Sequence, residues 1–434
     1  MTAVQPNPPP TYSSAFQVAG PVEATERIGT LDVLRGIALF GMFLVHFIER
    51  GGGVATTSFG RALVTVNTWF FVDRFMTMFA ILFGAGFAVQ LSRAEARPDG
   101  LGARYIRRLL ALAVFGVIAE DLFGFNILLI YALWGLPLLL TRNWSNRTVF
   151  IALIVCVLEF PLAWSGRAAY DMAAGGAEKY RQDTALCFPP LVILPSFAAT
   201  KMCTDARQRD MAGRRAARGA KPIGYLATVR ARFARTWTKY AHPTMWTYLP
   251  NVSFYLFLVG VLFFRLGVFQ RPAEHRRLIV TTMVLGAAAA ITGDYLWDFM
   301  HSAAATSVPV PLQIVGGLLL LALFQELWFA FVYIGAVLLL VARSPRWLER
   351  LRAFGITGRM ALTNYILQVI VLDLSLNSYG LGLKVRPEFA PLFAATLFAV
   401  DLAFSTWWLS RYRYGPLEWI WRSVTYLKAQ PLLR

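Results

Sequence analysis

Long apolar stretches, each of about the length that crosses a bilayer, alternate along the chain with short polar or basic connections. The pattern predicts membrane-spanning helices within residues 31–48, 65–91, 109–123, 127–140, 148–164, 249–264, 278–293, 314–341, 360–376 and 391–409. Repeated apolar segments of this length are typical of polytopic helical membrane proteins. We therefore expect an all-α, polytopic integral membrane helical bundle with about ten transmembrane helices.

Basic residues predict how this bundle is oriented. A run of arginines follows the second predicted span, and cytoplasmic connections of membrane proteins carry such an excess of Lys and Arg. The run consists of Arg93, Arg97, Arg104, Arg107 and Arg108. Counting spans in both directions from it places the N- and C-termini in the cytoplasm. The expected location is the cell (plasma) membrane, with a multi-pass topology.

Two segments fall outside this regular pattern. Residues 1–26 are polar and proline-rich without periodicity, which predicts a disordered N-terminal tail ahead of a single transmembrane domain over residues 27–434. Residues 165–248 form a long loop, which we place outside the cell. Its apolar piece, residues 186–199, is short and broken by prolines; if it crossed the membrane, all later helices would be inverted. Residues 249–434 form the C-terminal part of the domain.

Composition narrows the classes of partner. The chain of 434 residues is 57% hydrophobic and carries a formal net charge of +18. In a soluble protein this charge would suggest nucleic acid, but here the basic residues lie beside apolar segments, as the topology rule requires. We therefore expect the lipid bilayer as a partner and no nucleic acid. The three cysteines do not make a disulfide framework.

The first predicted span carries polar residues that a lipid-facing helix should not hold. A charge at membrane depth costs roughly 2.5–3.5 kcal/mol, so Asp32, Arg35 and His46 should face protein or water. Asp32 and Arg35 are three residues apart and can pair. Arg35 and His46 are 11 residues apart, close to three turns, so they share a face about 16 Å apart along the axis. We predict a catalytic role for all three.

In this interpretation Arg35 holds an anionic group of a substrate and His46 acts as a general base. The alternative is structural: Asp32 and Arg35 anchor the topology of the helix, and His46 makes a packing hydrogen bond.

Further polar groups lie in later spans. The stretch GRMALTNYILQ begins at Gly358 and contains four candidate substrate-binding residues: Arg359, Asn364, Tyr365 and Gln368. Such residues either orient a ligand or join helices by hydrogen bonds. Glu159, beside a proline in the fifth span, is a fifth candidate, with a buried hydrogen bond as the alternative. No ligand set for a metal converges in the sequence, so we expect no metal site.

Four stretches give the chain a resemblance. RIGTLDVLRGIALFGMFLVHF, FAILFGAGFAVQ, GRMALTNYILQ and the final RYRYGPLEWIWRSVTY resemble the bacterial YeiB-type family, which bears the C-terminal domain of unknown function numbered 418. That family looks like a branch of the transmembrane acyltransferase superfamily. In its acyltransferase-three members an Arg and a His with ten residues between them in the first helix are treated as essential, and Arg35 and His46 match that spacing.

The resemblance implies a donor such as acetyl-CoA that binds from the cytoplasm, and no tightly bound cofactor. The leading hypothesis is thus an acyltransferase-like membrane protein that acylates a hydroxyl or amine of a small-molecule or lipid-linked substrate. The rival is a transporter or exporter of a small or amphipathic metabolite, which would use the same polar stripe as its path. The third hypothesis is a membrane scaffold without turnover. The oligomeric state stays open in all three.

Overall fold

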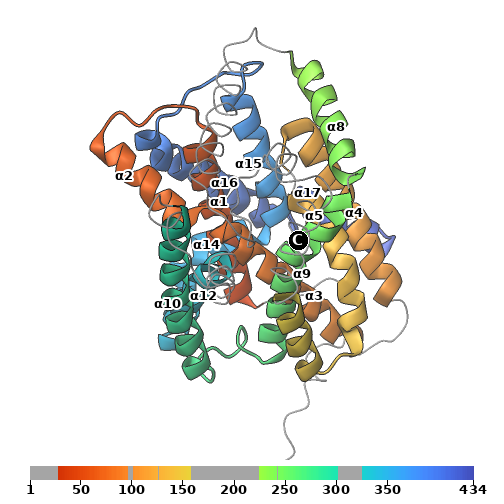
Figure 1. Cartoon of the computed structure of the whole chain (residues 1–434). Helices are drawn as coiled ribbons and strands as arrows, with labels where there is room; N and C mark the ends of the chain where they lie inside the picture. The colour runs from red at the N-terminus through yellow and green to blue at the C-terminus, as the bar shows by residue number, and fades with distance from the viewer. Residues whose placement is uncertain (1–27, 96–100, 126, 158–223, 242, 302–324) are drawn as a thin grey trace, which may run out of the picture.

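The computed structural model describes residues 28–95, 101–125, 127–157, 224–241, 243–301 and 325–434. The predicted tail and most of the predicted loop lie outside these residues. Within the described ranges all regular elements are helices, and β pairing is confined to two isolated bridges, Gly52 with Val385 and Tyr412 with Leu433. The all-helical class predicted from the sequence is confirmed (Figure 1).

The helices follow one another as α1 (Gly29–Arg50), α2 (Ser58–Val66), η3 (Asn67–Phe71), α3 (Arg74–Glu95), α4 (Leu101–Phe123), α5 (Ile127–Gly135), η4 (Leu136–Asn143), α8 (Tyr225–Ala241), α9 (Pro243–Arg265), α10 (Arg276–His301), α12 (Gln325–Arg343), α13 (Arg346–Arg350), α14 (Arg352–Arg359), α15 (Ala361–Leu376), η6 (Pro387–Phe389), α16 (Ala390–Arg411) and α17 (Pro416–Tyr426). A further helical stretch covers Asn146–Val157. The end of the predicted loop is therefore helical, because α8 begins at Tyr225.

Three stretches in the described residues are long and apolar enough to cross a membrane: α1, Arg74–Ser92 of α3, and Pro387–Arg411 of η6 and α16. Helices α14 and α15 pass the same criterion together, but they are bent by 86° at their junction. The described residues thus carry fewer spans than the ten expected. Four apolar helices in the described residues are shorter than a span: Ile127–Asn143, Asn146–Val157, Ser253–Arg265 and Leu327–Arg343. The predicted span 65–91 keeps one membrane-length part, in α3, but the chain breaks between η3 and α3 at Asp73, a residue in the left-handed region with φ of 62°.

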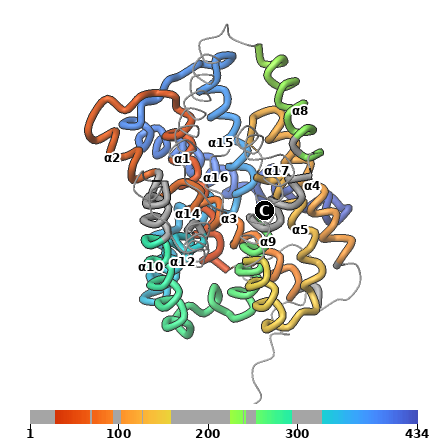
Figure 2. Tube along the Cα trace, in the orientation of Figure 1, coloured from red at the N-terminus to blue at the C-terminus, as the bar shows by residue number. Residues whose placement is uncertain are grey.

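Helix α1 lies in the middle of the bundle (Figures 1 and 2). Helices α3, α14, α15 and α16 all pack against it. The side chains of Leu34, Leu39, Phe43 and Phe47 are completely or almost completely buried in the core. Because apolar side chains surround α1, its polar side chains have to be accommodated by neighbouring protein groups rather than by lipid.

Helices α1 and α14 approach at backbone distance. A Cβ atom on Gly36 would lie 2.0 Å from the carbonyl oxygen of Phe354, and one on Gly358 would lie 1.9 Å from that of Asp32. Small residues permit such close crossings of membrane helices. The contact brings the junction of α14 and α15 next to the part of α1 that carries Arg35.

Gly358→Ala should destabilise the protein by about 1–3 kcal/mol, because the added methyl group meets backbone that has no room to move. The matched control is Gly355→Ala on the same helix, where the nearest atom to a Cβ is Val33 Cγ2 at 3.5 Å. That change should be neutral or slightly stabilising. Thermal unfolding of the detergent-purified variants measures the difference, and equal melting temperatures would contradict the close packing.

Candidate functional site

A cavity of about 230 Å³ lies where the first part of α1, the last part of α3 and the first part of α4 meet the α14–α15 junction and α17. Its wall has an apolar part, with Phe79, Phe83, Leu112 and Leu128. The charged part of its wall, within the described residues, consists of five arginines and two carboxylates: Arg35, Arg108, Arg359, Arg413, Arg422, Asp32 and Glu418. The cavity is thus lined both by apolar side chains and by an excess of basic ones.

Local contacts hold three of these arginines in place. Arg35 Nη1 donates to Asp32 Oδ1 at 3.0 Å, as the three-residue spacing predicts, and the pair is half-buried. The guanidinium of Arg108 lies over the ring of Trp421 at 3.8 Å, and that of Arg422 lies over Tyr414 at 4.6 Å. An aromatic face orients a guanidinium without neutralising its charge.

The Glu418 carboxylate is occupied by the first turn of α15. Its Oε1 accepts hydrogen bonds from the backbone N–H groups of Leu362 at 2.7 Å and Thr363 at 3.0 Å, and its Oε2 accepts one from Thr363 Oγ1 at 2.6 Å. The N–H groups at a helix start have no partner within the helix, so Glu418 caps α15 from a different helix. Burial raises the pKa of this carboxyl, while the hydrogen bonds from Thr363 act in the opposite direction.

Four of the sequence-predicted site residues line the cavity, namely Asp32, Arg35, Arg359 and Tyr365. The other two candidate residues of the GRMALTNYILQ stretch, Asn364 and Gln368, do not line the cavity. Asn364 Nδ2 donates to Thr357 O at 3.0 Å and to Ser405 Oγ at 2.9 Å, and Gln368 Nε2 donates to Asp401 Oδ2 at 2.8 Å. These bonds join α15 to α14 and α16, which is the packing role given as the alternative. Glu159 lies outside the described residues.

His46 is not among the residues that line this cavity. Its ring lies edge-on to Phe125 with 5.0 Å between the ring centroids, near the opposite end of α1. Its Nδ1 atom is buried and has no hydrogen-bond partner in the described part of the chain. Arg35 and His46 therefore share a helix without sharing a cavity.

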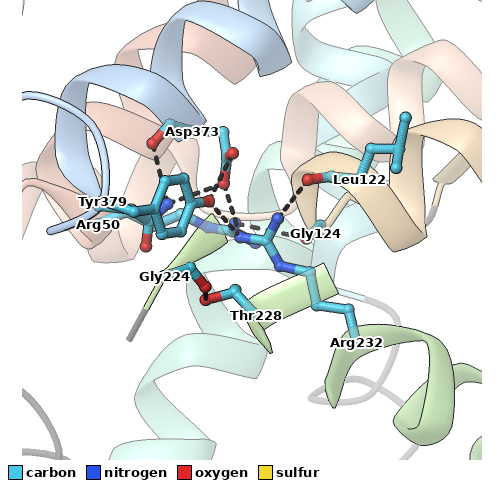
Figure 3. A network of polar contacts seen from close by, with 9 residues as sticks. Arg50, Leu122, Gly124, Gly224, Thr228, Arg232, Asp373 and Tyr379 are labelled. Carbon is cyan, nitrogen blue, oxygen red and sulfur yellow. Dashed lines mark hydrogen bonds and ion pairs between the residues drawn. The ribbon is translucent and has the colours of Figure 1, made fainter. Parts of the chain in front are cut away.

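Beyond His46 lies a network of polar contacts (Figure 3). Arg232 of α8 donates to the carbonyl oxygen of Leu122, to Asp373 Oδ1 at 2.6 Å and to the Tyr379 hydroxyl at 3.0 Å. The Tyr379 hydroxyl in turn donates to Asp373 Oδ2 at 2.6 Å. Burial raises the pKa of Tyr379, and its bond to Asp373 adds to the rise. The network fastens α8 to α15 and to the end of α4.

Arg50 connects His46 to this network. Its guanidinium lies over the ring of Phe125 at 4.1 Å, and its Nη1 donates to the carbonyl oxygen of Gly124 at 3.5 Å. Tyr365, which lines the arginine cavity, is close enough to Arg50 and Glu120 for their charges to act on it. Tyr365 therefore lies between the arginine cavity and the polar end of the bundle around His46.

The sequence interpretation missed part of the cavity. Arg108 belongs to the basic run that was used only as a topology signal, and Arg413, Glu418, Trp421 and Arg422 belong to the RYRYGPLEWIWRSVTY stretch, which supported only the resemblance. Three arginines and one glutamate within that short stretch were the available signal. Among the described residues, no three His, Cys, Asp or Glu side chains gather as metal ligands.

Glu418→Ala should lower the free energy of unfolding by about 2–4 kcal/mol, because two buried backbone N–H groups and one hydroxyl lose their acceptor. Glu388→Ala is the matched control. Glu388 also accepts from backbone N–H groups and a threonine hydroxyl, those of Thr56 and Thr57, but at an exposed position where water can replace it. Denaturant titration in detergent should show a much smaller effect for the control; equal effects would contradict a special role for Glu418.

Two family models match the chain. One is described as Protein of unknown function (DUF418) and matches residues 263–428, and the other as Heparan-alpha-glucosaminide N-acetyltransferase, catalytic, and matches residues 27–191. The arginine cavity combines both regions, because Arg35 and Arg108 come from the first part of the chain and Arg359, Arg413 and Arg422 from the last.

Similar proteins match over nearly their whole length. Uncharacterized protein YxaH of Bacillus subtilis is 28% identical over 95% of this chain and 98% of its own. An uncharacterized 39.9 kDa protein in the amylase 3'region of Bacillus acidopullulyticus is 26% identical over 95% of this chain and 98% of its own. Uncharacterized protein YeiB of Escherichia coli is 25% identical over 94% of this chain and 98% of its own. No solved structure matches the chain at a significant level. The resemblance seen in the sequence is confirmed: residues 263–428 match the DUF418 model, and the chain is similar over nearly its whole length to YeiB.

Proposed function

We propose that this protein is an integral membrane acyltransferase that takes an acyl group from an acyl-CoA-type donor and transfers it to a hydroxyl or amine acceptor. The observation that carries the proposal is the cavity, whose wall contains five arginines and two carboxylates. The similarity of residues 27–191 to the catalytic part of an N-acetyltransferase supports the same class of reaction.

The cavity suits a donor with an anionic end and an apolar arm. Guanidinium groups present planar pairs of N–H donors that match phosphate oxygens, so the arginine side would hold the phosphates of coenzyme A. The apolar wall formed by Phe79, Phe83, Leu112 and Leu128 would cover the arm. Both carboxylates of the cavity are already engaged, Asp32 with Arg35 and Glu418 with α15, so an incoming anion meets an excess of positive charge.

His46 would supply the base. Its Nδ1, which is buried and has no hydrogen-bond partner in the described part of the chain, would accept the proton of the acceptor O–H or N–H group. The oxygen or nitrogen of that group would attack the thioester carbonyl. The new C–O or C–N bond forms, the C–S bond breaks, and coenzyme A leaves as the thiolate. Arg35 and His46 lie about 16 Å apart along α1, so the acyl arm would have to extend past Tyr365 to reach the base. In this account Arg35 serves the donor end and His46 the transfer end.

The proposed topology keeps both termini in the cytoplasm of a plasma-membrane bundle of about ten spans. The cavity lies at the end of the bundle where α1 begins and α4 begins, near Arg104, Arg107 and Arg108. The excess of basic residues there supports a cytoplasmic position for this end. The network around Arg232 would then face the outside together with the loop that precedes α8. The acceptor would approach from that side.

A transporter is the second candidate because helical segments of the described chain are interrupted at two places. Helices α14 and α15 bend by 86° beside Arg359, and α2, η3 and α3 separate at Asp73. Discontinuous helices are typical of transporters, in which the freed helix ends bind substrate. Movement of an unmodified metabolite into proteoliposomes without release of coenzyme A would favour the transporter over the acyltransferase.

Acetyl-CoA should stabilise the purified protein against thermal unfolding, and Arg35→Ala should weaken this binding at least about tenfold because a charge-assisted contact to the donor is lost. Arg61→Ala, on the exposed surface of α2 and away from the cavity, should bind as wild type does. A folded wild-type protein that shows no shift with any acyl-CoA would contradict donor binding.

His46→Ala should retain acetyl-CoA binding but lose transfer by about two orders of magnitude or more, because only the base is removed. The measurement is release of coenzyme A in the presence of a panel of hydroxyl and amine acceptors, together with the acetyl-CoA dissociation constant. Wild-type rates in His46→Ala would exclude the base, and unfolding of that variant would instead show the packing role.

A further inference from the structure

Helix α17 contacts several walls of the arginine cavity at once. Its Glu418 caps α15 beside Arg359, and its Arg422 itself lines the cavity. Its Trp421 is also part of the lining and touches Arg108 of α4. The arrangement of arginines from distant parts of the sequence therefore depends on one short helix near the C-terminus.

Trp421 binds Arg108 in two ways. Its indole face lies 3.8 Å from the guanidinium carbon of Arg108, and its Nε1–H donates to the carbonyl oxygen of the same residue at 2.8 Å. The neighbouring Arg107 donates from Nε to the carbonyl oxygen of Thr425 at 3.0 Å. These contacts fix both the backbone of α4 and the plane of the Arg108 guanidinium relative to α17.

Arg108 is held among like charges. Arg422 and Arg35 both lie close enough to repel it, while its stacking partner Trp421 carries no charge. Arg108 and Arg422 are both half-buried in the wall of the cavity. A ligand with several negative charges on one group can bind more than one guanidinium at once, which favours a phosphate or diphosphate over a single carboxylate.

We propose that Arg108 and Arg422 form a phosphate subsite at the interface of α4 and α17, and that Trp421 is the positioning residue of this subsite. A guanidinium that packs on an aromatic face can still donate its N–H groups in pairs to phosphate oxygens. The assignment of these phosphates to coenzyme A rests on the proposed function. The phosphate subsite itself requires only a phosphate-bearing ligand.

The test compares three probes by isothermal titration with the full-length protein in detergent: acetyl-CoA, inorganic pyrophosphate and acetyl-pantetheine, which has the arm and thioester without phosphates. Arg422→Gln and Arg108→Gln should each weaken acetyl-CoA and pyrophosphate binding at least about tenfold. Binding of acetyl-pantetheine should stay within about threefold of wild type, because this probe has no phosphate for the removed guanidinium to bind.

The chain offers a matched control for both parts of the proposal. Arg411 lies over Trp407 at 5.1 Å, so it makes the same kind of stack near the end of α16, but neither residue lines the cavity. Arg411→Gln and Trp407→Leu should leave the binding of all three probes unchanged. If the loss of any arginine charge or any indole ring weakened probe binding in general, these two control variants would show it.

Two variants of Trp421 separate positioning from folding. Trp421→Phe keeps an aromatic face under Arg108 and removes the N–H donor, and it should retain pyrophosphate binding within about threefold. Trp421→Leu removes the face and should weaken pyrophosphate about tenfold while acetyl-pantetheine binds as before. A purely structural role would instead lower the melting temperature and weaken all probes together.

The outcomes keep the two proposals apart. Pyrophosphate binding that depends on Arg108, Arg422 and Trp421, without acetyl-CoA turnover, would support the phosphate subsite and reject the acyltransferase. Acetyl-CoA binding that none of the three changes affects would reject the phosphate subsite and leave the acyltransferase standing. Failure of wild-type protein to bind pyrophosphate and acetyl-CoA would overturn both.

Discussion

A helix that breaks inside an apolar bundle exposes backbone N–H groups that must find acceptors, and this constraint shapes the centre of the protein. The chain bends by 86° between α14 and α15, and the carboxylate of Glu418 accepts the N–H groups of Leu362 and Thr363 that the bend exposes. Helix α17 must therefore lie against the start of α15. Its position there brings Trp421 and Arg422 to the cavity and joins the last part of the chain to the first.

The two polar ends of α1 have different electrostatic character. Near Arg35 the charges are predominantly positive, and the carboxylates are engaged within the protein. Near His46 the network around Arg232 and Asp373 pairs charges of opposite sign and fastens helices together. An excess of one sign favours a ligand of the opposite sign, whereas balanced pairs favour stability of the fold. This difference supports the proposal that the donor binds at the Arg35 end of α1.

Hydrophobic periodicity predicted the helices well because apolar length is a local property. The pairing of Asp32 with Arg35 was also predictable from local sequence, because residues three positions apart lie on the same face of a helix. Hydrophobic periodicity did not predict that the apolar run 65–91 breaks at Asp73, where φ of 62° is unusual for aspartate. Nor did it show that Arg108 meets Arg422, because more than three hundred residues separate them and only tertiary packing brings them together.

The most direct test of the account is a structure of the protein determined with acetyl-CoA bound. The account predicts phosphate density beside Arg108 and Arg422, the arm along the apolar wall, and the thioester directed toward Tyr365. Density for acetyl-CoA at another surface, with the arginine cavity filled only by solvent, would contradict the central claim that this cavity is the donor site.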